Sequence, residues 1–230
     1  MGRGIAQVCA REGARVAFTY ASHPEKADAT LELVRRYGEG LSLQADLRDR
    51  ASAVRVVHEV DEAWGGIDLL VNNAAVSEAV PFPLLEDDDW ADLMELNLNA
   101  VFRLSRAAVR GMIRRKYGRI VNIGSIAGAR SIASPVHYAT SKGAIEGMTR
   151  SLAHELGTYG ILVNCIAAGI FEGGLKSTIP EHHQKRYVDS CALGRIGQPA
   201  ECGELVAWLG SSRNTYVNGA VVMLDGGTLA

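Results

Sequence analysis

The order of apolar runs and helical patterns is the feature that most restricts how this chain can fold. Short runs rich in β-branched residues alternate with longer stretches of helical periodicity along the whole sequence. This alternation is typical of a parallel sheet whose strands are joined by crossover helices. The strands are nearly continuously apolar, as in residues 67–71, which is expected when both faces of a sheet are covered. We therefore predict an α/β fold with a doubly wound, Rossmann-like parallel sheet.

The same pattern assigns the individual elements. The predicted strands are Ala14–Tyr20, Leu41–Ala45, Ile67–Asn72, Arg119–Ile123, Ile161–Ile166 and Ala220–Leu224. The predicted helices are Gly2–Gly13, Glu25–Tyr37, Arg50–Ala63, Asp87–Lys116, Val136–Leu156 and Ala200–Leu209. Internal repeats, linkers and low-complexity segments are missing from the pattern, so residues 1–230 are expected to form a single domain.

The beginning of the chain departs from the usual order of a doubly wound fold. Such a fold starts with a strand and a glycine-rich turn that leads into the first helix, whereas here the helix Gly2–Gly13 comes first. The first strand lies in the middle of the sheet, so its loss would leave two neighbouring strands without partners, at roughly 1–3 kcal/mol per unpaired buried group. We expect the domain to be N-terminally incomplete, with Met1 an internal methionine of a Gly-Met-Gly turn.

Composition excludes several classes of function. The 24 Lys and Arg residues nearly balance the 26 Asp and Glu residues, which removes the basic signature of a nucleic-acid binder. No apolar run approaches membrane-spanning length, and no secretory pattern occurs at the N-terminus. The four cysteines form no CxxC pair and the histidines lack zinc spacing, so we expect no metal site. A cytoplasmic, reducing location is the expectation.

Three polar residues in the middle of the chain form a pattern that bears on function. Ser125 follows the predicted strand Arg119–Ile123, where ligands bind in open α/β sheets. Tyr138 lies 13 positions after Ser125, and Lys142 lies 4 positions after Tyr138. Residues four apart share one face of a helix, so the phenol and the ammonium project together. A Tyr-x-x-x-Lys pair also occurs by chance in many helices, but the serine and the sheet context favour a functional site.

The chemistry of these three side chains matches carbonyl reduction. A carbonyl that accepts a hydride develops negative charge on its oxygen and needs a proton donor within reach. A tyrosine with an ordinary pKa of about 10 is a poor base at neutral pH. We expect the ammonium of Lys142 to stabilise the phenolate and so to lower the pKa of Tyr138. Ser125 would hold the substrate oxygen.

Further motifs follow one another in a fixed order. They are Asn72-Asn73-Ala74-Ala75, Leu96-Asn97-Leu98, Val163-Asn164 through Gly169, Gly194-Arg195 with Gln198-Pro199, and Asp225-Gly226-Gly227. With Ser125, Tyr138 and Lys142, they make the chain resemble the short-chain dehydrogenase/reductase family over essentially all of its 230 residues. The number of ordered matches makes this resemblance very specific.

The resemblance implies roles for the matching positions. Tyr138 would be the acid/base, Lys142 would tune it and bind the nicotinamide ribose, Ser125 would complete the catalytic set, and Asn97 would hold a water through which protons reach Lys142. The implied cofactor-binding positions, besides Tyr138 and Lys142, are Gly2 as the last glycine of the phosphate turn, Ser22, Asp46 and Leu47 near the adenine, Asn73 and Ala74 along the dinucleotide, and Gly169 beside the nicotinamide.

The end of the second strand of such a fold bears on the choice of cofactor. An acidic residue there binds the ribose 2′-hydroxyl and repels a 2′-phosphate. This chain has Thr19-Tyr20-Ala21-Ser22 at that point and no carboxylate before Glu25. NADP(H) is therefore favoured. Ser22 is either a contact to the phosphate or simply part of a polar loop.

Several positions depart from the family pattern. The glycine turn that should hold the pyrophosphate is absent except for Gly2, and its loss should weaken cofactor binding severely. Ala75 stands in place of a glycine, Ala168 in place of the usual proline before Gly169, and Gly173 in place of a common threonine. The last two changes bear on the positioning of the nicotinamide.

Among family members, the chain is most similar to 3-oxoacyl-(acyl-carrier-protein) reductases, which use basic residues to hold an acidic carrier protein. Arg114-Arg115-Lys116 could serve in this way, or could be a solvated helix end favoured by the helix dipole. The polar segment Glu172–Tyr187 falls where the family has its substrate lid, and its composition suggests a flap.

Three hypotheses of function remain open. The first is an NADPH-dependent reductase of 3-oxoacyl substrates, bound to a carrier protein, or of related ketones. The second is a dehydrogenase of a free small alcohol, sugar or secondary metabolite. The third is a non-catalytic partner subunit, which the incomplete start favours and the intact Ser125, Tyr138 and Lys142 disfavour. The family resemblance implies a homotetramer, and nucleic acid and membrane are not expected as partners.

Overall fold

The six apolar runs all form strands, and the pairs between them are parallel, as predicted. In the computed structural model, which describes residues 1–130 and 133–228, β1 (Val16–Tyr20) pairs with β2 (Gly40–Gln44). The other strands form a second sheet in the order β3 (Leu69–Asn72), β4 (Gly118–Ile123), β5 (Ile161–Ala168) and β6 (Val221–Leu224). The carboxyl ends of these four strands therefore meet at one edge of the sheet.

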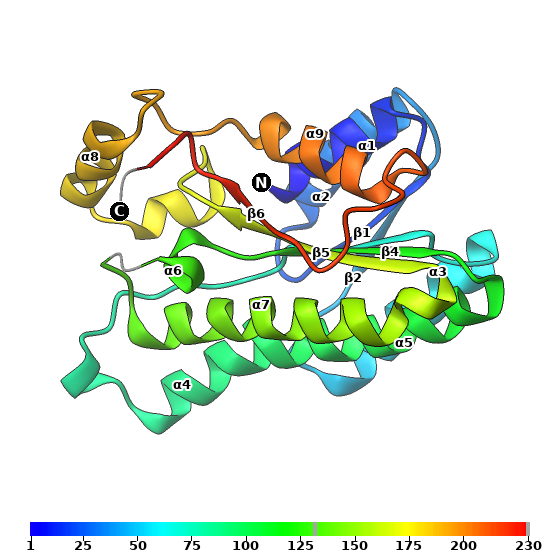
Figure 1. Ribbon diagram of the computed structural model, residues 1–230, viewed down its shortest axis with the longest axis horizontal. Helices are drawn as coiled ribbons and strands as arrows, with labels where there is room; N and C mark the ends of the chain where they lie inside the picture. The colour runs from blue at the N-terminus through cyan, green and yellow to red at the C-terminus, as the bar shows by residue number, and fades with distance from the viewer. Residues whose placement is uncertain (131–132, 229–230) are drawn as a thin grey trace.

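Helices cover both faces of the strands (Figure 1). One layer holds α1 (Gly2–Arg11), α2 (Pro24–Arg35) and α9 (Pro199–Gly210). The opposite layer holds α3 (Arg50–Trp64), α4 (Asp87–Met94), α5 (Ala100–Arg115) and α7 (Val136–Leu156). Further helical elements are η1 (Phe82–Leu84), α6 (Ile126–Ala129), η3 (Gly157–Tyr159), η4 (Gly174–Thr178) and α8 (Glu181–Ser190). Within the described residues, none of these helices combines the length and apolarity needed to span a bilayer.

The hydrophobic core is divided between the two faces. On one face, Ile5 of α1 and Val206 of α9 pack against Val121 and Ile166 of the central strands. On the other face, residues of α5 and α7 pack against Ile120 and Val163 of the same strands, and α3 packs on α5. All six residues of β4 are buried. This two-sided burial explains why the central strands are continuously apolar in sequence.

β1 and β3 face each other without pairing. β1 pairs only with β2, and β3 pairs only with β4, so among residues 1–130 and 133–228 no strand lies between them. Among the described residues, each of these two strands therefore has one edge without a strand partner, as predicted. The single continuous sheet expected for a doubly wound fold is correspondingly divided in two.

The predicted continuous helix Asp87–Lys116 is wrong in its middle. It is divided into α4 and α5 by η2 (Glu95–Asn99), a stretch of π-helix. A π-turn accommodates an extra residue and often marks a functional position. Hydrophobic periodicity is only slightly disturbed by one widened turn, which is why the sequence pattern did not reveal it. The predicted flap Glu172–Tyr187 also contains regular structure, since it forms η4 and most of α8.

The contact between α1 and α9 depends on two glycines. A Cβ atom at Gly4 would lie 2.6 Å from the carbonyl carbon of Pro199, and one at Gly203 would lie 2.9 Å from the carbonyl oxygen of Gly4. Both distances involve backbone atoms, which cannot rotate away as the end of a side chain can. The missing side chains therefore let the two helices approach each other over the same face of the sheet.

We predict that Gly203→Ala destabilises the protein, because the added methyl group would push α9 away from α1. The expected loss is about 1–3 kcal/mol in the free energy of unfolding, as for overpacking in a tight core. Urea unfolding would measure it. The matched control is Gly147→Ala in α7, where no atom lies within 4 Å of the new Cβ. That change should stabilise the helix by about 0.5–1 kcal/mol. If Gly203→Ala left the free energy of unfolding unchanged, the two helices would not be in contact through this position.

Candidate active site

A contact between two helices brings Ser125 and Lys142 to the same place. Ser125 lies two residues after the end of β4 and is the N-cap of α6. Its Oγ accepts a hydrogen bond from the backbone N–H of Ala127 at 3.2 Å. A Cβ at Gly128 of α6 would lie 2.6 Å from the carbonyl carbon of Lys142. Because residue 128 is glycine, α6 lies directly on the turn of α7 that carries Lys142. The sequence motifs did not single out Gly128, although a Ser-x-x-Gly segment after a strand was a visible signal.

The ammonium group of Lys142 is enclosed by the protein. Its Nζ donates a hydrogen bond to the carbonyl oxygen of Ile123 at 2.8 Å and lies 5.7 Å from the centre of the Tyr138 ring. Burial lowers the pKa of Lys142 from 10.5 to about 8, because desolvation disfavours the charged form. The predicted proximity of Tyr138 and Lys142 on one helix face is therefore present in the structure.

The expected direction of the Tyr138 pKa is wrong. We predicted a lowered pKa from the neighbouring ammonium group, but burial of the phenol raises it, and a hydrogen bond with Ser125 offsets only part of this effect. The physical reason is that Lys142 directs its Nζ to the Ile123 carbonyl and is itself strongly desolvated. Tyr138 is consequently a protonated phenol at neutral pH, held next to the Ser125 hydroxyl.

Asn97 lies in the π-helical turn and is almost completely buried. Its Oδ1 accepts the backbone N–H of Val76 at 2.9 Å, and its Nδ2 donates to the carbonyl oxygen of Val76 at 2.9 Å. The same Nδ2 donates to Oγ of Ser141, the residue before Lys142, at 3.3 Å. Asn97 thus connects the segment after β3 to α7, beside the predicted catalytic residues.

A buried polar network that the sequence analysis did not identify fixes α7 on the sheet. The Nδ2 atom of Asn72 donates to Oδ1 of Asn122 at 2.8 Å, and Nδ2 of Asn122 donates to Oγ1 of Thr149 at 2.9 Å. These residues belong to β3, β4 and α7. Within the Asn72-Asn73-Ala74-Ala75 motif, the first asparagine therefore has a structural role. The signal was present in the sequence as polar residues inside apolar strands.

The predicted cofactor positions lie along the carboxyl ends of the strands. Gly2 and Asn73 are neighbours, since a Cβ at Gly2 would lie 2.8 Å from Nδ2 of Asn73. Ala74 follows Asn73 and is exposed, as is Ser22 after β1. A bound dinucleotide would meet the bare backbone of Gly2 and the side-chain amide of Asn73, which can both donate hydrogen bonds to phosphate oxygens, so these residues fit such a group.

Asp46 and Leu47 follow β2 and differ in exposure. Asp46 is exposed, and its Oδ1 accepts the backbone N–H of Arg48 at 3.0 Å. Leu47 is buried in the core between β2, α3 and α5. Leu47 nevertheless lines the opening that Gly2 and Ser22 also line, whereas the side chain of Asp46 is exposed to solvent.

Gly169 follows β5 at the same edge, where its neighbours leave no room for a side chain. A Cβ there would collide with the Tyr187 hydroxyl, which donates a hydrogen bond to the carbonyl oxygen of Asp225 at 2.8 Å. Tyr187 belongs to α8, so this contact holds the predicted lid segment against the ends of β5 and β6. Nearby, the carboxylate of Asp225 lies 3.5 Å from the Arg130 guanidinium.

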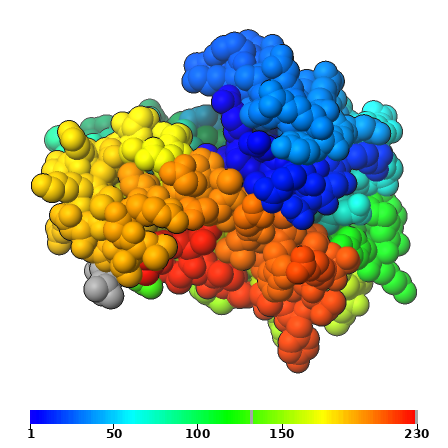
Figure 2. All heavy atoms as spheres, turned by 90° about the horizontal axis from the view of Figure 1, so that it is seen from above, coloured from blue at the N-terminus to red at the C-terminus, as the bar shows by residue number. Residues whose placement is uncertain are grey.

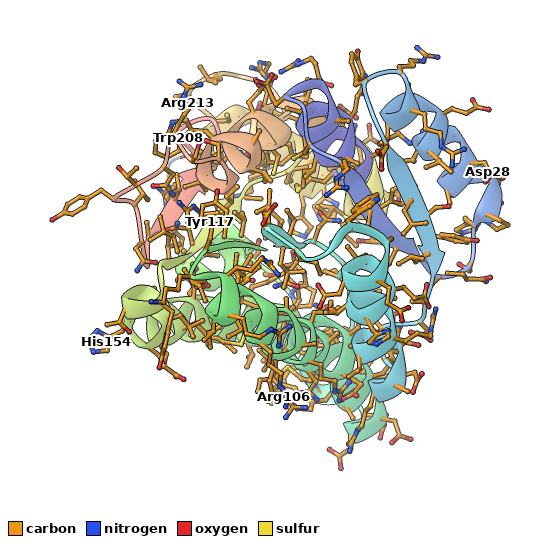
Figure 3. The ribbon with its side chains drawn as sticks, turned by 90° about the vertical axis from the view of Figure 1, so that its right-hand side faces the viewer. Asp28, Arg106, Tyr117, His154, Trp208 and Arg213 are labelled. Carbon is orange, nitrogen blue, oxygen red and sulfur yellow. The ribbon has the colours of Figure 1, made fainter. Side chains whose placement is uncertain are left out.

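Arg114-Arg115-Lys116 does not join this site. It ends α5 just before β4 begins, whereas Ser125 comes after β4 ends, and six residues of strand separate the two by about 20 Å. Figure 3 shows this opposite edge and labels Tyr117, the residue that follows the basic run in the sequence. Arg115 donates to the carbonyl oxygen of Ile67 at 2.6 Å. Within one chain, the basic run therefore cannot flank the site, which favours the helix-end interpretation.

Comparison with known proteins gives the same picture over nearly the whole chain. A family model described as enoyl-(acyl carrier protein) reductase matches residues 1–228. The chain is 36% identical to the 3-oxoacyl-[acyl-carrier-protein] reductase of Pseudomonas aeruginosa over 231 residues, which cover 98% of this chain and 93% of that protein. It is 33% identical to the 3-oxoacyl-[acyl-carrier-protein] reductase of Escherichia coli over 227 residues, which cover 99% of this chain and 92% of that protein.

Solved structures agree. A short-chain dehydrogenase/reductase from Serratia marcescens is 33% identical, with a TM-score of 0.91 over 98% of this chain and 92% of that chain. A gluconate 5-dehydrogenase from Burkholderia cenocepacia, solved in complex with NADP and tartrate, is 29% identical. Its TM-score is 0.91, with 98% of this chain and 89% of that chain covered. The chain therefore belongs to the short-chain dehydrogenase/reductase family of NAD(P)-dependent oxidoreductases that act on CH–OH and ketone groups.

Proposed function

We propose that this protein is an NADP(H)-dependent carbonyl reductase that acts on a 3-oxoacyl group bound to a carrier protein, or on a related ketone. The observation that carries the proposal is the position of Ser125, Tyr138 and Lys142 at the carboxyl end of β4, with Tyr138 held protonated by burial. A buried neutral phenol next to a serine hydroxyl is suited to give a proton to a carbonyl oxygen.

The proposed proton transfer balances the reduction. When bound, the nicotinamide supplies the hydride that adds to the carbonyl carbon. The Tyr138 O–H bond breaks as its proton moves to the carbonyl oxygen, which becomes the hydroxyl of the product. Ser125 donates a hydrogen bond to that oxygen as its negative charge develops. Lys142 lies close enough to the ring, at 5.7 Å from its centre, to stabilise the phenolate left behind.

The other predicted residues support this centre. Asn97 is proposed to take part in returning a proton toward Lys142, which is supported by its hydrogen bond to Ser141. Gly2, Asn73, Ala74 and Gly169 are proposed to border the dinucleotide. Asp46 and Leu47 are proposed to lie near its adenine, with Asp46 as the polar contact.

The preference for NADP(H) is supported by the residues that follow β1. Ser22 and Lys26 are exposed there and line the same opening as Gly2, and no carboxylate comes between β1 and Ser22. A 2′-phosphate at this point would meet a hydroxyl and an ammonium group rather than a negative charge. The related gluconate 5-dehydrogenase was solved with NADP.

The substrate class is supported by the relatives, whose names specify 3-oxoacyl groups on acyl-carrier protein. A free hydroxy compound is the second candidate, because the gluconate 5-dehydrogenase has the same TM-score of 0.91 as the Serratia enzyme. Turnover of a 3-oxoacyl thioester compared with that of free alcohols and sugar acids would separate the two. The third hypothesis, a non-catalytic partner subunit, would be favoured by a failure to bind NADPH.

The assembly and location belong to the same proposal. A homotetramer is supported by large apolar side chains exposed on the outer helices, such as Trp90, Phe102 and Trp208. Trp208 is labelled at the surface in Figure 3. A cytoplasmic location is supported by the cysteines at 9, 165, 191 and 202, all buried and unpaired, as in proteins of reducing compartments.

We predict that Tyr138→Phe lowers kcat for reduction of a 3-oxoacyl thioester by about 10²–10⁴-fold, because the proton donor is lost. Steady-state kinetics with NADPH would measure this, and fluorescence titration should show that NADPH still binds. Tyr159→Phe, at an exposed tyrosine beyond the far end of α7, is the control and should leave kcat unchanged. Parent-like turnover by Tyr138→Phe would remove the phenol from the mechanism.

The lowered pKa of Lys142 predicts a pH-dependent difference in stability. Between about pH 8 and pH 10.5, the unfolded chain holds a proton on Lys142 that the folded chain gives up, so stability rises with pH in this window. Relative to Lys142→Met, the unmodified protein should gain about 2 kcal/mol of unfolding free energy between pH 7 and pH 10. Urea unfolding at both pH values would test it. The control is Lys185→Met, at an exposed lysine. Relative to this variant, the unmodified protein should show no gain in unfolding free energy between pH 7 and pH 10.

We predict that Ser22→Asp reverses the cofactor preference, because a carboxylate at this point repels a 2′-phosphate and can bind a 2′-hydroxyl. The ratio of NADPH to NADH affinity should fall by about tenfold or more. Fluorescence titration with both cofactors would show it. Ser212→Asp adds the same charge at an exposed serine beyond α9 and should leave the ratio unchanged. An unaltered ratio in Ser22→Asp would place the 2′ position elsewhere.

A further inference from the structure

The motif Asp225-Gly226-Gly227, which the proposed function does not use, forms a tight turn after β6. Gly226 and Gly227 have φ angles of 68° and 75°, in the left-handed region that glycine adopts most readily. Two hydrogen bonds to Asp225 close the turn: its Oδ1 accepts the backbone N–H of Gly227 at 3.1 Å, and its carbonyl oxygen accepts the hydroxyl of Thr228 at 2.8 Å. Three other parts of the chain are bound to this turn.

The first part is the end of α8, the helix that completes the predicted lid segment. The backbone N–H groups of Ala192 and Leu193 donate to the carbonyl oxygens of Gly227 and Gly226 at 3.3 and 3.1 Å. The thiol of Cys191 donates to the carbonyl oxygen of Gly226 at 3.2 Å. In Figure 2, the yellow and orange atoms of this region lie beside the red atoms near the end of the chain. Main-chain contacts therefore anchor the lid segment at its carboxyl end.

The second part is the end of β5, which Tyr187 of α8 connects to the turn. The Tyr187 side chain is buried, and its hydroxyl donates a hydrogen bond to the carbonyl oxygen of Asp225 at 2.8 Å. A Cβ at Gly169 would lie 2.1 Å from this hydroxyl oxygen and 3.0 Å from the ring carbon that bears it. Gly169 itself donates its N–H to the carbonyl oxygen of Leu224 at 2.9 Å. The phenol thus contacts the backbone of Gly169 and fixes how close Gly169 lies to the turn.

The ring of Tyr187 also supports the helix that begins at Ser125. Tyr187 and Cys191 form one buried apolar cluster with Ile126, the residue that follows Ser125 in the sequence. Ser125 is the N-cap of α6, so its position depends on how this short helix is oriented. The lid helix α8 therefore packs against the first residue of α6.

The third part bound to the turn is the far end of α6. Arg130, which follows α6, donates a hydrogen bond to the carbonyl oxygen of Thr228. Its guanidinium group lies 3.5 Å from the carboxylate of Asp225, whose side chain is only 6% exposed. A buried carboxylate needs such a partner, because an unpaired buried charge is costly. Both ends of α6 are thus held, one by the cluster around Tyr187 and the other by the turn.

Packing alone does not explain the hydroxyl of Tyr187. A phenylalanine would bury the same ring without desolvating a polar group. The hydroxyl is instead paired with a backbone carbonyl and placed against a glycine. Gly169 is proposed to border the nicotinamide, and Ser125 is proposed to hold the substrate oxygen. Tyr187 therefore supports both sides of the proposed reaction centre.

We propose that Tyr187 is a positioning residue for the reduction: its hydroxyl sets the place of Gly169, and its ring sets the orientation of the helix that begins at Ser125. This inference rests on the proposed function. The anchored end of the lid segment would then align the hydride donor with the substrate carbonyl, without contact between Tyr187 and the reacting atoms. Because a misplacement of about 1 Å can lower a rate by about 10²-fold, loss of the hydroxyl should affect turnover more than binding.

The variant Tyr187→Phe separates the hydroxyl from the ring. With a 3-oxoacyl thioester and NADPH, kcat should fall by about tenfold, whereas KM for the thioester should change by less than about threefold. Fluorescence titration should show as many NADPH molecules bound per chain as in the parent, which excludes loss of folded protein as the cause. Tyr216→Phe makes the same change at a tyrosine that is 97% exposed, and this matched control should keep the parent kcat.

Hydrogen exchange tests the same contacts without using activity. In Tyr187→Phe, the amides of Gly169 and Leu193 should exchange at least about threefold faster, because both donate to carbonyl groups beside the lost hydrogen bond. The amide of Gly128, which donates to the carbonyl oxygen of Ser125, should keep its rate, because the ring remains. Tyr187→Leu removes the ring as well, so in this variant the Gly128 amide should also exchange faster.

A parent-like kcat of Tyr187→Phe overturns the proposal. So does a fall in kcat matched by an equal fall in the number of NADPH molecules bound, since the tyrosine would then only stabilise the fold. Unchanged exchange of the Gly169 amide in Tyr187→Phe, or of the Gly128 amide in Tyr187→Leu, also contradicts it. If the parent protein does not reduce the thioester, the proposed function fails instead, and the exchange rates decide whether Tyr187 positions Gly169 and the helix of Ser125.

Discussion

The positions of Ser125 and Lys142 relative to each other depend on a contact between backbones. Gly128 lets α6 rest on the turn of α7 that holds Lys142, so the serine at the start of α6 and the lysine are fixed by main-chain atoms rather than by flexible side chains. The network from Asn72 through Asn122 to Thr149 then fastens α7 to the central strands. A misplacement of about 1 Å can lower a rate by about 10²-fold, and rigid supports of this kind oppose such shifts.

Burial explains the electrostatics of the site better than charge does. Both Tyr138 and Lys142 are shifted toward their neutral forms, the phenol by a raised pKa and the ammonium by a pKa of about 8. Desolvation shifts the pKa of each group independently of the other, and it acts in the folded protein before any reaction begins. An attraction between phenolate and ammonium would come into effect only as the proton leaves Tyr138. Stabilisation that grows with developing charge acts on the transition state rather than on the resting protein.

Much of the fold and of the site could be predicted from the sequence, and the failures have physical reasons. The strands, the parallel pairing and the face shared by Tyr138 and Lys142 follow from local periodicity, which a sequence displays directly. The π-turn around Asn97 depends on a tertiary contact with Val76, and the raised pKa of Tyr138 depends on the depth of burial. Neither the tertiary contact nor the depth of burial can be read from the spacing of residues in the sequence. For the basic run at 114–116 the sequence left two interpretations open, because distance along the chain does not show at which edge of the sheet a residue lies.

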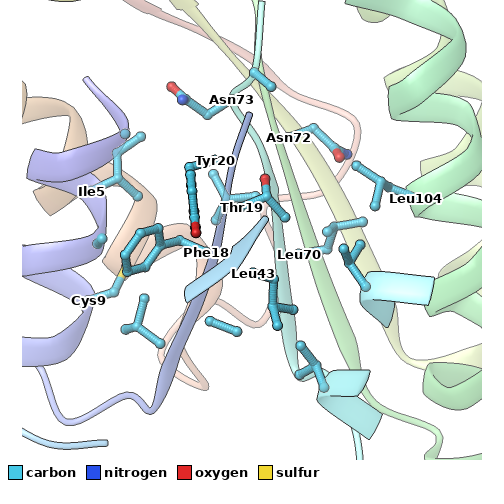
Figure 4. Close-up of a pocket in the computed structure, with 18 of the residues that line it drawn as sticks. Ile5, Cys9, Phe18, Thr19, Tyr20, Leu43, Leu70, Asn72, Asn73 and Leu104 are labelled. Carbon is cyan, nitrogen blue, oxygen red and sulfur yellow. The ribbon is translucent and has the colours of Figure 1, made fainter. Parts of the chain in front are cut away.

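The divided sheet connects stability with ligand binding. β4 is buried on every residue, whereas β1 and β3 keep partly exposed apolar side chains where the two sheets face each other (Figure 4). Gly2, Ser22 and Asn73, the proposed contacts of the dinucleotide, line the same space between the two sheets. Tyr138 and Lys142 belong instead to the well-packed half of the molecule, around β4, β5 and α7. The chemical centre and Asn73 therefore stand on the continuous four-stranded sheet, whereas Ser22 and Asp46 follow the strands of the separate two-stranded sheet.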